Sequence, residues 1–137
     1  MKLSCALLFT LTLSSFGCTT VRGNAELAWQ TLNVVDAGQT QHIASAPACY
    51  QEADPLSVLL MGKHPSNGEA AGVFVLYAAG HLVVSKALEK KAESGSRSWK
   101  AAEIAWHVLS LVTKTAYVAH NHKLGLRPFG KGCHHVL

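Results

Sequence analysis

Polar side chains recur at helical spacing along the last long apolar stretch of this chain. Separations of four, three, four and seven residues place them on one face of a helix: Glu103, His107, Ser110, Lys114 and Asn121. The earlier stretch "NVVDAGQTQHIA" puts Asp36, Gln39 and Thr40 on one face and His42 on another. Carboxylate, imidazole and ammonium groups on facing helices could transfer protons, bind a metal ion or pair with one another.

Lys114 needs either a partner or a route to water, because a charge at the centre of a bilayer costs about 2.5–3.5 kcal/mol. Glu103 lies too far along the same helix for direct contact, so Asp36 is the candidate partner. Alternatively, the flexible stem of Lys114 lets its ammonium group snorkel outward to the membrane surface. The sequence leaves both interpretations open.

His81 lies midway along the preceding apolar stretch, one helical turn from Tyr77 and from Ser85. It could relay protons or bind a metal ion, or its imidazole could hydrogen-bond to another helix. The second interpretation is favoured, because polar groups commonly join membrane helices in this way. Gly72 and Gly80 are small enough to let a neighbouring helix approach closely, which agrees with it.

Histidine and cysteine gather near the end of the chain, where imidazole and thiolate could bind zinc, nickel or copper. The residues concerned are His120, His122, Cys133, His134 and His135. Their spacing is not that of a defined zinc motif, so we expect neither a metal ion nor a cofactor. Cys49 is predicted to lie on the same side of the membrane as Cys133. The two could form a disulfide in an oxidising compartment, or remain free thiols.

Enzyme motifs are absent from the sequence, which has no G-x-S-x-G, H-E-x-x-H or C-x-x-C pattern and no phosphate-binding glycine loop. Ser110 and His107 are the only neighbouring candidates for a nucleophile and a base, and such a spacing arises readily by chance. We therefore expect a protein that is not an enzyme.

Two stretches have the length and apolar content of membrane spans. Residues 66–88 begin with a capping box formed by Ser66 and Glu69, and the apolar part reaches about 30 Å at 1.5 Å per residue. Residues 99–121 form a second, more polar span. The connection between them is strongly basic, which indicates the cytoplasmic side. It carries Lys86, Lys90, Lys91, Arg97 and Lys100. The loop before the first span and the C-terminal tail are then predicted to face the periplasm.

Residues 24–46 form the remaining long helix, with Asn24 as its N-cap. Both ends of this polar helix are predicted to lie outside the cytoplasm, so it cannot cross the membrane once. It could lie along the outer face of the membrane, re-enter it, or show that one orientation signal is wrong. We favour a helix packed on the spans near the periplasmic surface. Asp54 and Pro55 predict a short helix that ends at Gly62.

The N-terminus is typical of an export signal over residues 1–17, because Lys2 precedes an apolar run too short for a comfortable span. Ser15, Phe16, Gly17 and Cys18 are similar to the lipobox of bacterial lipoproteins, although Ser15 and Phe16 depart from its usual residues. Lipidation of Cys18 and an ordinary signal remain alternatives. Charged residues make up 15% of the chain, against about 25% in soluble domains, which also favours a membrane protein.

Several short motifs resemble a group of small, uncharacterised bacterial integral membrane proteins. Their pattern is D-x-x-x-T on a first helix, E-x-N-P-L and G-x-H-P-S in the next loop, a span bearing histidine, and asparagine near the end of the last helix. The corresponding residues are Asp36, Thr40, Glu52, Asp54, Pro55, Leu56, Gly62, His64, Pro65, Ser66 and Asn121. Asp54 stands where the pattern has asparagine, and Lys114 stands where an acidic residue is expected. The resemblance covers about residues 29–126 and implies a compact helical membrane domain, not a chemistry.

We therefore expect an all-α fold, a small helical membrane bundle in which two transmembrane helices carry a polar first helix within one domain, residues 18–137. The expected function is non-enzymatic: a small protein of the bacterial inner membrane that contacts membrane lipid and other envelope proteins, but not nucleic acid. Its N-terminus and C-terminal tail are expected in the periplasm. The alternative is an intramembrane polar site for proton or metal-ion handling, lined by Asp36, His81, His107 and Lys114.

Overall fold

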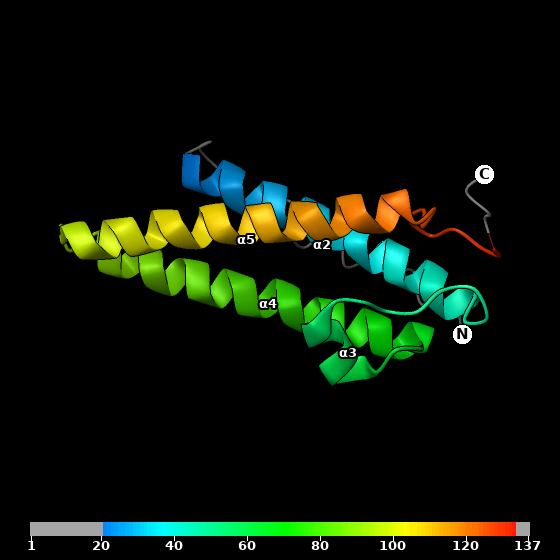
Figure 1. Cartoon of the computed structure of the whole chain (residues 1–137). Helices are drawn as coiled ribbons and strands as arrows, with labels where there is room; N and C mark the ends of the chain where they lie inside the picture. Colours follow the sequence, from blue (N-terminus) through cyan, green and yellow to red (C-terminus); the bar gives the residue numbers. More distant parts are fainter. Residues whose placement is uncertain (1–20, 134–137) are drawn as a thin grey trace.

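The computed structural model describes residues 21–133, and this part of the chain folds into four helices packed together, without strands. The helices are α2 (Val21–Ser45), α3 (Pro55–Met61), α4 (Asn67–Ala92) and α5 (Arg97–Lys123). The three long helices lie side by side, with α4 antiparallel to α2 and α5 (Figure 1). The all-helical prediction is confirmed. The predicted signal over residues 1–17, the lipidation of Cys18, and His134 and His135 lie outside the described residues.

Local signals set most of the helix starts. Ser66 caps α4, since its hydroxyl accepts from the Glu69 N–H at 3.2 Å while the Glu69 carboxylate accepts from the Ser66 N–H at 2.8 Å. Asp54 caps α3 directly before Pro55, as predicted. The prediction for Asn24 is wrong, because α2 begins at Val21 and continues through Asn24.

Side chains are distributed in the reverse of the usual soluble pattern. The residues between the long helices are largely polar or charged, including Glu26, Asp36, His81, Glu103, His107 and Lys114. Large apolar side chains point away from the bundle, among them Leu76, Val83, Ile104, Leu109 and Val112. One small apolar cluster lies near the start of α4 and joins Met61, Ala70, Val73 and Phe74. Polar groups that leave water and apolar groups that face outward are what a lipid environment favours.

Within the described residues, α4 is the one helix long and apolar enough to cross a membrane by length and composition. The α5 helix is similar in length, but its inward face carries polar and charged residues such as Glu103 and Lys114. The prediction of two spans is therefore not confirmed.

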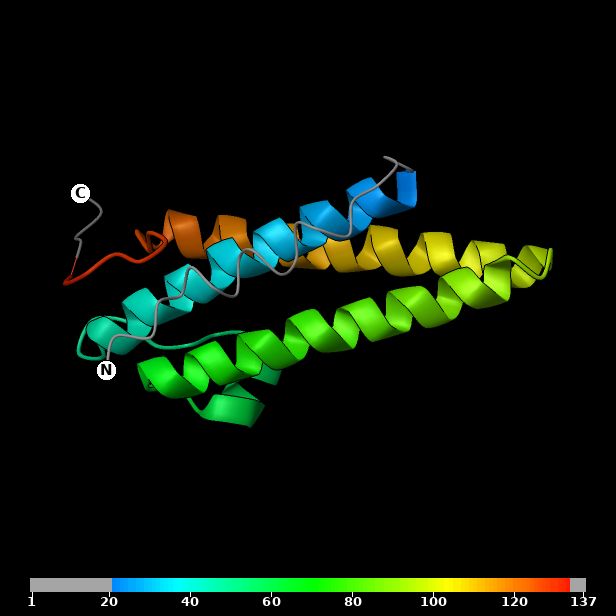
Figure 2. The same cartoon turned by 180° about the vertical axis from the view of Figure 1, so that it is seen from behind.

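The polar first helix is not confined to one end of the bundle. It extends along both other long helices, from Arg22 beside Glu103 near the start of α5 to Gln39 beside Val118 near its end. Figure 2 shows this lengthwise packing from behind. Val21 consequently lies at the same end of the bundle as the connection between α4 and α5, and Ser45 lies at the opposite end (Figure 1).

The prediction that Gly72 and Gly80 allow close helix approach is wrong. Both lie on the exposed face of α4, and a Cβ atom added at either would meet nothing within 4 Å. The close approach is instead made by Gly38 of α2, where an added Cβ would lie 3.1 Å from Phe129 and from Pro128. Glycine thus admits the C-terminal tail against α2, because any side chain there would displace it.

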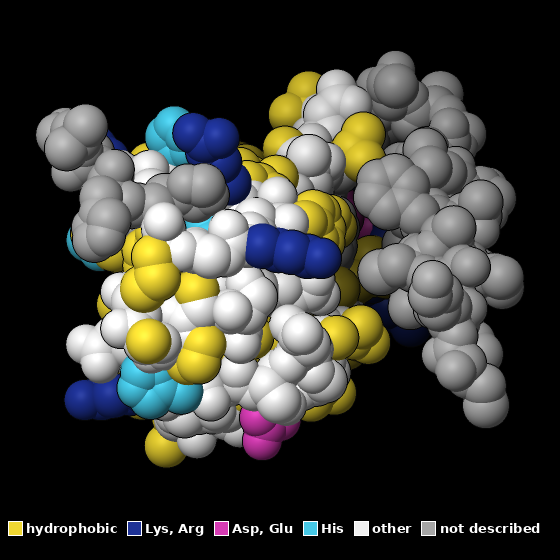
Figure 3. All heavy atoms as spheres, turned by 90° about the vertical axis from the view of Figure 1, so that its right-hand side faces the viewer, with side chains coloured by type: hydrophobic (Ala, Val, Ile, Leu, Met, Phe, Trp, Pro, Cys, Tyr) yellow, Lys and Arg dark blue, Asp and Glu magenta, His cyan; other side chains and the backbone are white. Residues whose placement is uncertain are grey.

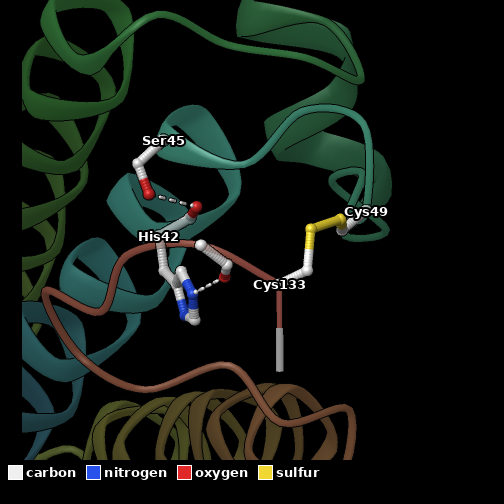
Figure 4. The surroundings of a disulfide bond; sticks show 5 residues. His42, Ser45, Cys49 and Cys133 are labelled. Atoms are coloured by element: carbon white, nitrogen blue, oxygen red, sulfur yellow. Dashed lines mark hydrogen bonds between the residues drawn. A yellow bond between two sulfur atoms is a disulfide. The ribbon is translucent and has the colours of Figure 1, made fainter. Parts of the chain in front are cut away.

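The tail after α5 is fastened to the end of α2. The Phe129 N–H donates to the Gly38 carbonyl at 2.9 Å, and a disulfide joins Cys49 to Cys133 with Cα atoms 5.8 Å apart (Figure 4). Of the two alternatives that the sequence left open for these cysteines, the structure has the disulfide. Figure 3 views this end of the bundle, where basic and histidine side chains project among hydrophobic and uncharged ones.

Candidate functional site

A buried ion pair joins α2 to α5 near the middle of the bundle. Lys114 Nζ donates to Asp36 Oδ2 at 2.8 Å, and Asn121 Nδ2 donates to Asp36 Oδ1 at 3.2 Å. Lys114 is 7% exposed, so its ammonium group does not snorkel outward and the predicted pair with Asp36 is present. This arrangement gives both carboxylate oxygens a donor, which a buried charge requires.

Aromatic rings enclose the Lys114 ammonium group. Nζ lies 5.0 Å from the ring centre of Phe74, 5.3 Å from that of Tyr77 and 5.4 Å from that of Trp29. The faces of such rings attract a cation, and the attraction is larger where water is excluded. The rings therefore stabilise the ammonium group from sides that Asp36 does not reach.

A second buried pair joins α2 to α4, closer to the start of α2 than Asp36 is. His81 Nδ1 lies 3.0 Å from Glu26 Oε2 and 3.1 Å from Oε1. Gln30 and Ser85 also donate to Glu26, at 2.7 Å and 2.8 Å. The second ring nitrogen of His81, Nε2, lies 3.0 Å from Ser110 Oγ of α5, so His81 contacts both neighbouring helices. This agrees with the predicted interhelical role of His81.

The sequence analysis did not identify Glu26. A signal for it exists, because Glu26, Trp29, Asn33, Asp36 and Thr40 follow one another at separations of three or four residues. All of them are buried. Extending the face of Asp36 and Thr40 toward the start of the helix would have included Glu26.

Both ring nitrogens of His81 have polar neighbours. Nδ1 donates to the Glu26 carboxylate, which as an anion can only accept. Nε2 lies 3.0 Å from Ser110 Oγ, and the same hydroxyl lies 3.2 Å from the His107 carbonyl. The His81 ring is stacked on Trp29, with ring centres 3.8 Å apart, and its centre lies 5.0 Å from that of Trp106.

Glu26, His81 and Ser110 lie in the order of a catalytic triad: carboxylate, imidazole and hydroxyl. Two features separate this arrangement from a working one. The Ser110 hydroxyl also has the His107 carbonyl as an acceptor, at 3.2 Å, which competes with donation to His81 Nε2. Ser110 also lies inside α5, where backbone N–H groups are engaged in the helix and cannot form an oxyanion hole. The arrangement joins α2, α4 and α5 through one set of side chains.

The third charged contact lies at the end of the bundle where α4 connects to α5. Arg22 Nε lies 2.8 Å from Glu103 Oε1, an ion pair without the alignment of a hydrogen bond. His107 is buried, and its Nδ1 atom has no hydrogen-bond partner among the described residues. A groove of about 370 Å³ runs between α2 and α5 here. Its lining includes Val21, Ala25, Ile104, His107, Val108 and Leu111.

The other predicted site residues divide between the helices and the loops. Gln39 donates to the carbonyls of Val118 and Leu126, at 3.2 Å and 3.4 Å, and so joins α2 both to α5 and to the segment that follows α5. Thr40 donates to Glu52 Oε2, in the loop between α2 and α3, at 3.0 Å.

Glu52 is a buried carboxylate in the loop between α2 and α3. Burial raises the pKa of Glu52, against the opposing effect of its donors, which are the N–H groups of Asp54 and Ala53 and the Thr40 hydroxyl. The pKa is raised on balance because the loss of hydration outweighs these hydrogen bonds.

The candidate metal ligands do not converge within residues 21–133, where no three histidine, cysteine, aspartate or glutamate side chains form a group that could hold a metal ion. His120 and His122 are exposed near the end of α5. Cys133 is occupied by its disulfide.

Comparison of the chain with protein-family models, with curated proteins and with solved structures finds no match. The resemblance to small bacterial membrane proteins stays a prediction. What the site can do follows from its own geometry: opposite charges from three helices meet in pairs, with α2 contributing to each of them.

Proposed function

We propose that the chain is a small, non-enzymatic integral protein of the bacterial inner membrane. The observation that carries this proposal is the contrast between the surface and the interior of the bundle. Charged side chains meet between the helices, whereas leucine, isoleucine and valine side chains of α4 and α5 point outward. A bundle with this distribution can bury its apolar exterior in lipid, where its interior charges remain paired.

All three long helices cross the membrane in this proposal, although α4 alone is apolar enough by composition. The helix α2 extends along α4 and α5, and its polar residues face them rather than lipid. Inward-facing polar residues lower the mean hydropathy of a helix without exposing charge to acyl chains, which explains why α2 and α5 read as polar sequences.

The orientation rests on two signals that agree. The basic connection between α4 and α5 lies at one end of the bundle and favours the cytoplasm. The disulfide between Cys49 and Cys133 lies at the other end and favours the oxidising periplasm. Val21 then lies on the cytoplasmic side, which conflicts with the expected export of residue 18. The proposed orientation therefore places Val21 on the cytoplasmic side, contrary to the expected periplasmic N-terminus, and the C-terminal tail in the periplasm as expected.

The role proposed for the buried pairs is to hold α2 between the other helices. Asp36 with Lys114 and Arg22 with Glu103 join α2 to α5, and Glu26 with His81 joins it to α4. Paired charges of this kind specify which helices meet and in which register. The assembled bundle then offers an apolar exterior to membrane lipid and to other envelope proteins.

Proton handling is a second candidate, favoured by His107. Its unpartnered Nδ1 atom is buried in the same region as Glu103, and its ring centre lies 6.3 Å from that of His81. A proton could pass between these groups, because buried ionisable residues in membrane helices commonly form such relays. Trp29 separates them from Lys114 and Asp36, which argues against a continuous path across the bundle.

Topology reporters fused after Ser94 and after Leu137 test the main proposal in intact cells. We expect a cytoplasmic signal at Ser94, a periplasmic signal at Leu137, and a protein that alkaline carbonate does not extract from membranes. Extraction into the soluble fraction would contradict membrane insertion. A periplasmic signal at Ser94 would overturn the orientation.

A further inference from the structure

The segment between α2 and α4 lies beside the bundle and not beyond its end. After Ser45 the chain turns back along α4, forms α3, and only then returns to the start of α4 (Figure 1). Ser57 Oγ of α3 lies 3.3 Å from the hydroxyl of Tyr77, whose Cα is about 15 Å along α4 from Asn67 at 1.5 Å per residue. Met61 packs with Val73 and Phe74.

The outward face of α3 is apolar. Leu56, Leu59 and Leu60 lie at helical spacing and are 53%, 79% and 51% exposed, whereas Ser57 and Met61 face the bundle. No residue from Pro55 to Met61 carries a charge. This seven-residue helix packs on Val73, Phe74 and Tyr77 of α4 through Met61 and Ser57, and its three exposed leucines form an apolar outward surface.

Backbone N–H groups from Glu52 to Val58 find acceptors within this segment. The Glu52 N–H donates to the Lys63 carbonyl at 2.8 Å, which joins the two arms of the segment. Glu52 Oε1 accepts from the N–H groups of Ala53 and Asp54, at 3.0 Å and 3.1 Å.

The same pattern continues into α3. Asp54 accepts from the N–H groups of Leu56 and Ser57 through its carboxylate and from that of Val58 through its carbonyl. Pro55, between them, has no N–H to satisfy. Every N–H from Glu52 to Val58 therefore has an acceptor within the protein. Non-helical backbone at membrane depth needs its polar groups satisfied by protein or by water, and these hydrogen bonds meet that need for the N–H groups.

We infer that residues 46–66 form a re-entrant segment, which enters the bilayer from the disulfide end and leaves it on the same side, with the leucines of α3 against lipid acyl chains. This inference rests on the membrane insertion proposed above. It replaces the earlier expectation of a periplasmic loop over these residues. Lys63 and His64, which are exposed, mark the point at which the segment returns to the surface.

Spin labels on single cysteines test this inference in the full chain. Leu59→Cys carries the label in a Cys5→Ser, Cys18→Ser background that keeps the native disulfide. Matched labels at Leu76→Cys, on the exposed face of α4, and at Lys63→Cys report the lipid and water environments. The protein is reconstituted in vesicles of phosphatidylethanolamine and phosphatidylglycerol, and collisions with oxygen and with a neutral water-soluble nickel complex are measured.

We expect the label at residue 59 to behave like that at residue 76, with nickel collisions several-fold fewer than at residue 63 and frequent oxygen collisions. Nickel collisions at residue 59 as frequent as at residue 63, with residue 76 still in lipid, would overturn the re-entrant segment alone. Shielding of residue 59 from both reagents would also overturn it, because a second copy or another protein would then cover α3. Nickel access at residue 76 would overturn the proposed membrane insertion itself.

Discussion

Lys114 and Asp36 come from helices far apart in the sequence, and their charged atoms meet at 2.8 Å inside the bundle. Neither charge has another route to water, because both side chains are less than one-tenth exposed. Breaking a buried pair leaves one charge without compensation, at a cost of about 3–5 kcal/mol. We therefore expect Asp36→Asn and Lys114→Met to lower the free energy of unfolding by amounts of this order, measured by unfolding in detergent.

The double variant Asp36→Asn with Lys114→Met should be less destabilised than the sum of the single variants, because no charge is then left unpaired. Lys86→Met is the matched control. Lys86 pairs with Glu89 at the same 2.8 Å but on the surface, where such a pair is worth about 1 kcal/mol or less. If all single variants lowered the free energy of unfolding by equally small amounts, Lys114 would not be held in the interior by a pair with Asp36.

Ser110 should not react with a fluorophosphonate probe, despite its position beside His81 and Glu26. The probe needs a serine whose proton a base can accept and an oxyanion site to stabilise the product. The His107 carbonyl competes with His81 for the Ser110 proton, and the backbone N–H groups beside Ser110 are engaged in α5. Labelling followed by gel fluorescence or mass spectrometry checks this. Labelling that is lost in Ser110→Ala and kept in Ser98→Ala would refute the non-enzymatic interpretation.

The raised pKa of Glu52 predicts how the free energy of unfolding changes with pH. A carboxyl group whose pKa is raised in the folded state binds its proton more tightly when folded. Its stabilising effect is therefore full below the ordinary pKa of 4.5 and is lost as the pH rises through the folded pKa. Glu52→Gln removes this titration, while its amide oxygen can still accept from the Ala53 and Asp54 N–H groups.

The stability of Glu52→Gln relative to the natural protein should consequently increase from about pH 4.5 toward neutral, by at most about 1.4 kcal/mol per pH unit. Thermal unfolding in detergent at a series of pH values measures the difference. A relative stability that decreases over this range would mean that the hydrogen bonds to the carboxylate outweigh its burial.

The sequence predicted the contacts that depend on helical periodicity. Asp36 was the candidate partner of Lys114 because each stood on a polar face of a helix, although the sequence left open that Lys114 snorkels outward. The capping residues Ser66 and Asp54 were visible from their local spacing. The position of α2 was not predictable in this way. The sequence favoured a helix packed on the spans near the periplasmic surface, whereas the partners of its polar residues lie along two other helices and are distant in sequence.

Glycine was misread for a related reason. A small residue permits close packing but does not say which element packs there, so Gly72 and Gly80 suggested a helix contact that the structure lacks. Gly38, whose contact is with a loop after α5, carried no periodic signal. Prediction of the buried ion pairs is limited in the same way. Helical spacing places Glu26 on the inward face of α2, but it does not show that His81 and Ser85 are its partners.

Gly38 and Gly72 provide a matched test of which glycine faces protein and which faces outward. Valine at Gly38 would drive its side chain into Pro128 and Phe129, which already lie 3.1 Å from the site of a Cβ atom. We expect Gly38→Val to lower the free energy of unfolding by about 1–3 kcal/mol, the usual cost of overpacking, and to loosen the tail that follows α5. Gly72→Val adds its side chain where nothing lies within 4 Å, so its effect should stay within a few tenths of a kcal/mol or stabilise the protein slightly. Thermal unfolding of both variants, with hydrogen exchange at the Phe129 N–H that donates to Gly38, separates the two sites. A larger loss at Gly72 than at Gly38 would mean that the outward face of α4 is packed against another protein rather than open to lipid.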